Sequence, residues 1–209
     1  MNQKPVKGEY LEVLLRAHQT VFSTKDVVLL WGEDNGKIIA SRLHAYAQAG
    51  KLVRMRRGFY AKDNAYDRLE LATRIYTPAY ISFETVLTRS GINFQHYDTI
   101  FVASYVTRDI EVQGQKISYV RMKDYVLSNT AGIEHSGAYS IATKERAVLD
   151  RIYISKEYHF DNLGSVSRDA IFEILPIYHN KKMKKTVQEY FQQYSAEDEY
   201  VSGGKKTNV

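Results

Sequence analysis

Apolar and polar positions in the first sixty residues follow a helical rhythm broken by short polar turns. Apolar side chains recur at helical spacing over residues 9–17, which predicts a first helix. Ser23 and, three positions later, Asp26 form the acidic variant of a capping box immediately before the apolar run 27–31. A short second helix is therefore expected to begin at this pair.

A third helix and a hairpin follow in the same segment. The turn-forming cluster 32–36 precedes helical spacing over 37–49. Two strand-like runs, 52–55 and 59–61, then flank the tight loop Arg56-Arg57-Gly58, in which glycine suits a positive φ. Three helices followed by a basic hairpin is the order of a winged helix-turn-helix.

The third helix separates its apolar and polar side chains. At about 100° per residue, Ile39 and Leu43 fall on the side that faces inward. The opposite side carries a stripe of four polar residues, Lys37, Ser41, His44 and Gln48, and Arg42 lies on its flank. Each stripe residue can donate a hydrogen bond to a phosphate or a base edge, and none would repel DNA. Such a helix suits a DNA major groove.

Positive charge is concentrated in this same part of the chain. Residues 1–62 carry a net charge of +6, whereas the remaining residues sum to −1, and residues 35–62 hold seven basic side chains without one carboxylate. A local positive field of this kind attracts polyanions, of which nucleic acid is the commonest. The alternative is a solvated basic face on an ordinary amphipathic helix. The predicted DNA-contacting residues are Lys37, Ser41, Arg42, His44 and Gln48 on the helix, and Lys51, Arg54, Arg56, Arg57 and Tyr60 on or beside the hairpin.

Beyond residue 62 the pattern mixes helices and strands. The expected fold class is therefore α+β, with a winged helix-turn-helix domain over residues 1–62, a mixed α/β domain over 63–195 and a flexible polar tail over 196–209. Helices are expected at 67–75, 82–89, 143–152, 167–175 and 181–194, and strands at 99–103, 109–112 and 116–121. Fourteen of the seventeen tyrosines lie after residue 62, where they form either an interface or the edge of a core.

Motifs of common enzymes are absent from the sequence. The absence of cysteine excludes disulfide frameworks, thiolate metal sites and cysteine nucleophiles, and no Asp-x-Lys, Glu-x-Lys, His-x-x-x-His or Gly-x-Ser-x-Gly occurs. Gly32–Lys37 is one residue short of a phosphate loop, and Asp109 and Glu111 form a pair that we expect to face solvent. Without a long apolar run, the chain is expected to be cytoplasmic. A binding protein without cofactor or metal is favoured over an enzyme.

Several segments, in this order and spacing, resemble the AbiEi family of antitoxins. The resemblance spans about residues 10–194 and is carried by the helix-turn-helix ending in 50–60 and by 80–87, 139–150, 160–163 and 177–182. Members of this family regulate bacterial type IV toxin–antitoxin and abortive-infection operons. The resemblance implies a winged helix that binds inverted repeats in double-stranded promoter DNA and represses its own operon.

The resemblance also implies a partner and a role for the second domain. The operon partner of the family is a nucleotidyltransferase-like toxin, which the C-terminal domain counters without a stable complex. For Glu145, Arg146 and Asp150, helix-terminus charge and ion pairing favour a structural role over a reactive site. Two alternatives remain open: a repressor without a toxin partner, whose second domain senses a ligand or dimerises, and an interaction module or enzyme that acts on nucleic acid.

Overall fold

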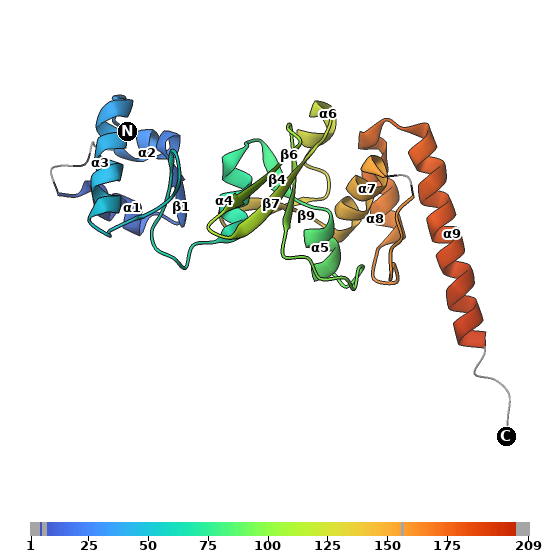
Figure 1. Cartoon of the computed structure of the whole chain (residues 1–209). Coiled ribbons are helices and arrows are strands. Elements are labelled where there is room, and N and C mark those ends of the chain that lie inside the picture. The colour runs from blue at the N-terminus through green and yellow to red at the C-terminus, as the bar shows by residue number, and fades with distance from the viewer. Residues whose placement is uncertain (1–4, 6–7, 156, 204–209) are drawn as a thin grey trace, which may run out of the picture.

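The chain folds into an α+β molecule built on two separate sheets (Figure 1). The computed structural model describes residues 5, 8–155 and 157–203. The first sheet belongs to an N-terminal unit, residues 8–62, and the second to the remainder of the chain, which we call the second unit. The expected α+β class is confirmed.

The N-terminal unit contains three helices and a three-stranded antiparallel sheet. Its elements, in chain order, are α1 (Tyr10–Arg16), β1 (Val21–Ser23), α2 (Thr24–Trp31), α3 (Gly36–Gln48), β2 (Val53–Arg56) and β3 (Phe59–Ala61). The strands lie in the order β1-β3-β2. Strand β1 was not expected, because three residues are too short for a period of two to stand out.

Caps and core contacts explain why these helices begin where they do. Ser23 and Asp26 form the capping box of α2, with both reciprocal hydrogen bonds present. The Asn35 side chain accepts from the first backbone N–H groups of α3. Trp31 is fully buried and donates its indole N–H to the Tyr10 carbonyl at 2.9 Å, which ties α2 to α1.

The second unit is built around a mixed six-stranded sheet. Its helices are α4 (Arg68–Ile75), α5 (Glu84–Arg89), α6 (Asp124–Leu127), α7 (Lys144–Ile154), α8 (Arg168–Ile174), the 3₁₀ turn η1 (Leu175–Tyr178) and α9 (Lys181–Gly203). Its strands are β4 (Ala79–Ile81), β5 (Ile100–Ser104), β6 (Arg108–Val112), β7 (Gln115–Arg121), β8 (Ile133–Ser136) and β9 (Tyr139–Ala142), in the order β6-β7-β5-β4-β9-β8. Helix α7 contacts α5, α8 and α9, and the N-terminal unit and α9 lie at opposite ends of the molecule (Figure 1).

The expected helices and hairpin of the second unit are present, with additions. Strands β4, β8 and β9 and the short helix α6 were not expected. The segment from residue 196, expected as a polar tail, continues helix α9 as far as Gly203. Residues 204–209 lie outside the described residues, so the mobility expected of them stays a prediction. Within the described ranges, no helix has both the length and the apolar character needed to cross a membrane.

An apolar cluster joins the two units. Val21, Met55 and Ala61 of the first sheet pack with Leu71 of α4 and Val112 of β6. All five side chains are buried. The opposite face of the first sheet packs against α1, α2 and α3 through a cluster of its own. The first sheet is therefore buried on both faces.

Polar side chains of α4 bind both ends of β1. Glu70 is 1% exposed and accepts hydrogen bonds from the Thr20 backbone N–H at 2.8 Å and the Thr20 hydroxyl at 2.6 Å. Arg74 donates to Glu70 at 2.8 Å and to the Asp26 carboxylate at 3.1 Å. Asp26 is the same carboxylate that accepts from the Ser23 N–H in the α2 cap. We call Thr20, Glu70, Arg74 and Asp26 the α4 clamp, because they fix β1 and the start of α2 to the second unit.

Candidate nucleic-acid interface

Helix α3 presents the expected polar stripe to solvent. Ile39 and Leu43 are fully buried against the other two helices, which fixes the rotation of α3 about its axis. All four stripe residues are exposed: Lys37, Ser41, His44 and Gln48. The helix lies at the end of the molecule remote from the second unit (Figure 1). Its outer face is therefore open to a large partner.

Arg42 takes part in helix packing. Its guanidinium carbon lies 3.7 Å from the centroid of the Tyr10 ring, so the group stacks over an aromatic face of α1. Its Nη1 atom is buried and makes no hydrogen bond within the described part of the chain. This arrangement gives Arg42 a structural contact in addition to the DNA contact predicted for it.

The hairpin arginines have different surroundings. Arg54 is exposed, and Arg57 is exposed at the two-residue tip beside Gly58, whose φ of 79° agrees with the expected turn. A register shift between Arg54 and Arg56 places Arg56 opposite Phe59. Residues directly opposite in an antiparallel pair share a face. Arg56 is thus half-buried on the face that packs toward the second unit, where its charge acts on the Tyr119 hydroxyl.

The prediction that Tyr60 contacts DNA is wrong. Tyr60 is 4% exposed and packs in the helix-facing core of the N-terminal unit. Because β3 is the central strand of the first sheet, its alternate residues point into a core on each face. The Tyr60 ring is therefore unavailable to DNA.

Four exposed basic side chains on and after α3 lack local acidic partners, unlike Arg16 of α1, which pairs with Glu12. Among the described residues, no ion pair involves Lys37, Lys51, Arg54 or Arg57. The half-buried Lys62 donates to the carbonyl of Ala17. An unpaired, solvated cation on a folded surface keeps its full electrostatic attraction for a polyanion. The four positions retain the charge that phosphate contacts require.

The second candidate cluster, Arg146 and Asp150, lies in a closed network inside the second unit. Both side chains are fully buried, and Nε of Arg146 donates to Asp150 at 3.2 Å. Asp150 also accepts from the hydroxyls of Tyr80 (3.0 Å), Ser82 (2.8 Å) and Tyr178 (2.7 Å). Burial, and then the Asp150 carboxylate, raises the pKa of Tyr80 and Tyr178 well above the ordinary value, so both phenols stay protonated donors.

The remaining donors of Arg146 are also satisfied. Nη1 donates to the carbonyl of Ala131 at 2.7 Å, and Nη2 donates to the carbonyl of Val126 at 2.8 Å and to the Tyr80 hydroxyl at 3.0 Å. A network with every donor and acceptor paired leaves no group for a substrate. Glu145 accepts from the Ser167 N–H at 3.1 Å and so anchors the start of α8. These contacts agree with a structural role for the cluster.

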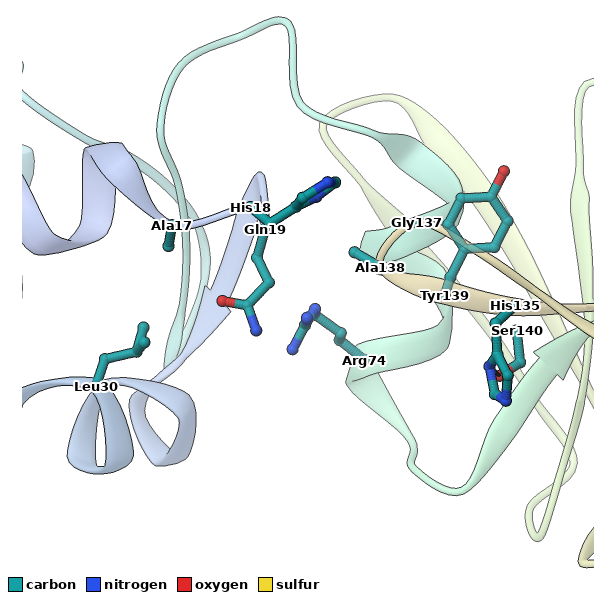
Figure 2. A pocket seen from close by; sticks show the side chains of 10 residues that line it. All are labelled: Ala17, His18, Gln19, Leu30, Arg74, His135, Gly137, Ala138, Tyr139 and Ser140. Carbon is teal, nitrogen blue, oxygen red and sulfur yellow. Dashed lines mark hydrogen bonds between the residues drawn. The ribbon is translucent and has the colours of Figure 1, made fainter. Parts of the chain in front are cut away.

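A cleft of about 520 Å³ lies between the two units (Figure 2). In Figure 2 the Gln19 amide and the Arg74 guanidinium point toward one another from the two sides, and the His18 ring extends into the gap. On the second unit, the ring of His135 bonds the Ser140 hydroxyl at 3.1 Å. Because Arg74 already pairs with two carboxylates of the α4 clamp, the cleft offers hydrogen bonds but little free positive charge.

Sequence reasoning missed three residues that organise these regions: Glu70, Arg74 and Tyr178. Their partners lie 28 to 50 positions away in the chain, and no local pattern marks such contacts. Asp109 and Glu111 are exposed on the edge strand β6, as expected. Among the residues that the structure describes, no group of three or more histidine or carboxylate side chains is placed to hold a metal ion. No protein-family model matches the chain, and no curated protein matches it either.

Proposed function

We propose that the chain is a sequence-specific double-stranded-DNA-binding regulator whose N-terminal unit is a winged helix-turn-helix. The order α1-β1-α2-α3-β2-β3, with strand order β1-β3-β2, is that of a three-helix unit followed by a hairpin wing. In this assignment α3 is the recognition helix, and Lys37, Ser41, His44 and Gln48 read the major groove. The observation that carries the proposal is this exposed stripe, which is free of carboxylates and next to unpaired basic residues.

The wing contributes phosphate contacts in this proposal. Arg54 and Arg57 on the hairpin, with Lys51 before it, would bind the backbone or an adjacent minor groove. Arg42 is kept as a contact on the flank of α3, with its stacking on Tyr10 limiting its reach. Tyr60 is left out because it is buried.

We further propose that the protein represses its own operon and acts as an antitoxin of the AbiEi type. The resemblance of residues 10–194 to that family supports this proposal, and three of its segments, 80–87, 139–150 and 177–182, meet in one buried network of the second unit. Residues far apart in the chain thus act together to hold one fold. In this proposal the second unit counters a nucleotidyltransferase-like toxin encoded beside the regulator.

The test of DNA binding is a fluorescence-anisotropy titration of the full chain. The probes are the duplex immediately upstream of its own coding sequence and a scrambled duplex of the same composition, at several salt concentrations. Specific binding typically exceeds non-specific binding by a factor of about a thousand or more. A clear preference with a steep salt dependence is expected, and equal affinity for both duplexes would refute the proposal.

The antitoxin activity has a separate test. The neighbouring reading frame is expressed alone and together with the full chain, and growth is followed. We expect the neighbour to arrest growth and the chain to relieve the arrest. Relief should persist when Lys37 and Ser41 are both replaced by alanine, because α3 lies at the far end of the molecule from the second unit. Arrest without relief would leave a regulator that has no antitoxin role.

A further inference from the structure

The outer face of α3 carries two exposed apolar residues, Ile38 and Ala45, beside its polar stripe. Ile38 and Ala45 lie about 80–100° around the helix from Lys37, on the same exposed side. Ile38 is 41% exposed, although the next residue, Ile39, is fully buried. The core of the N-terminal unit therefore does not depend on Ile38.

The spacing of Ile38 and Ala45 along α3 matches the spacing of base pairs in a DNA major groove. The two residues are seven positions apart, which is about 10 Å along the helix axis, or about three base-pair steps. Single exposed apolar side chains are common and need no special explanation. Here, however, the isoleucine stands in the first turn of the helix that we assign to the groove, next to Lys37 and Ser41. Its apolar surface would be covered only when DNA is bound.

We infer that Ile38, assisted by Ala45, reads thymine through the C5-methyl group in the major groove. Thymine is the base that presents a methyl there, and apolar side chains recognise it by contact. Ala45 is small enough to let the groove wall approach the helix closely. The inference rests on the proposed function and specifies which base the site prefers: the polar stripe supplies hydrogen bonds, and Ile38 distinguishes thymine from cytosine.

The experiment is a double-mutant cycle that removes the Ile38 side chain from the protein and the thymine methyl groups from the DNA, separately and together. Full-length protein, wild type and Ile38→Ala, is titrated with the upstream duplex and with the same duplex in which every dT is replaced by dU. Each thymine methyl in contact with the wild type should give about fourfold weaker binding when it is removed. Ile38→Ala should lose most of this difference between the two duplexes, because only the smaller contact with Ala45 remains. Ile38→Val should fall between the two.

Ile154→Ala is the matched control. Ile154 is 42% exposed on α7 in the second unit, so the variant loses the same atoms from an equally exposed site away from α3. It should keep the full sensitivity to dU. Equal dU sensitivity in wild type and Ile38→Ala, or none in wild type, would overturn the inference while leaving DNA binding intact. Failure of the wild type to prefer the upstream duplex over a scrambled one would instead refute the proposed function.

Discussion

At the scale of single residues, the β2–β3 hairpin separates arginines by surroundings. Arg54 and Arg57 are exposed, whereas Arg56 lies opposite Phe59 on the face toward the second unit. Each lost phosphate contact lowers the slope of log affinity against log salt by about one. Replacing both Arg54 and Arg57 by alanine should therefore reduce the slope by about two and weaken binding to all sequences, as measured by anisotropy at graded salt.

Arg56→Ala serves as the comparison for that pair. It should change the salt dependence less than either exposed arginine does, because its side chain faces protein. If the salt-dependence slope falls as much with Arg56→Ala as with Arg57→Ala, the bulge in β2 does not keep Arg56 away from DNA.

Also at the residue scale, Arg146 should be among the most sensitive positions for folding. Arg146→Met leaves the buried carboxylate of Asp150 without its cation, a change that typically costs about 3–5 kcal/mol. Lys185→Met breaks an exposed pair of the same i,i+4 spacing with Glu189 and should cost less than about 0.5 kcal/mol. Urea unfolding of both variants measures the difference. A loss at Arg146 as small as that at Lys185 would mean that water reaches the network.

At the scale of elements, the sequence predicted helices better than strands. The predicted helices rest on caps and on an apolar stripe, which the chain carries locally: Ser23 with Asp26, Asn35 and Thr143 each accept a backbone N–H as caps. Strands β4 and β9 are three and four residues long; β4 pairs with β5, β9 pairs with β8, and the two strands meet each other only at Ile81 and Ile141. That pairing joins residues sixty positions apart, so no local pattern announces it.

The α4 clamp is an element-scale feature with its own test. Arg74→Met removes the cation that joins the α2 cap to α4 and leaves the buried Glu70 with fewer partners. The variant should lose about 1–3 kcal/mol of stability in urea unfolding. Arg16→Met, which breaks an exposed i,i+4 pair with Glu12, should lose almost nothing. Equal losses would show that Arg74 does not help to hold the two units together.

At the scale of the whole molecule, charge and periodicity in the sequence predicted where the candidate site lies. They did not predict which of its residues are accessible to DNA. The concentration of basic residues before residue 62 and the polar stripe of α3 are properties of the sequence itself. The half-burial of Arg56 depends on a second unit that covers the outer face of the first sheet, whereas Tyr60 is buried by the helices of its own unit. Such coverage is a tertiary contact, and a pattern read along one hairpin does not contain it.

This coverage predicts how an isolated N-terminal unit behaves. A fragment of residues 1–62 would expose Val21, Met55 and Ala61, which are buried in the full chain. Exposed apolar patches of this kind promote association. The fragment should self-associate or precipitate in size-exclusion chromatography at concentrations where the full chain does not. A monomeric fragment with native-like stability would show that the two units fold independently.

The double burial of the first sheet also bears on how new operator preferences arise. The N-terminal unit cannot be transferred alone to another protein, because its first sheet packs against Leu71 and Val112 of the second unit. A recipient protein would have to supply matching apolar side chains. Preference for a different DNA sequence is expected to change through substitutions at the few outer positions of α3, with the framework behind them left unaltered. In such proteins, DNA-sequence preference would then evolve by single substitutions on one face of α3 and not by the exchange of whole domains.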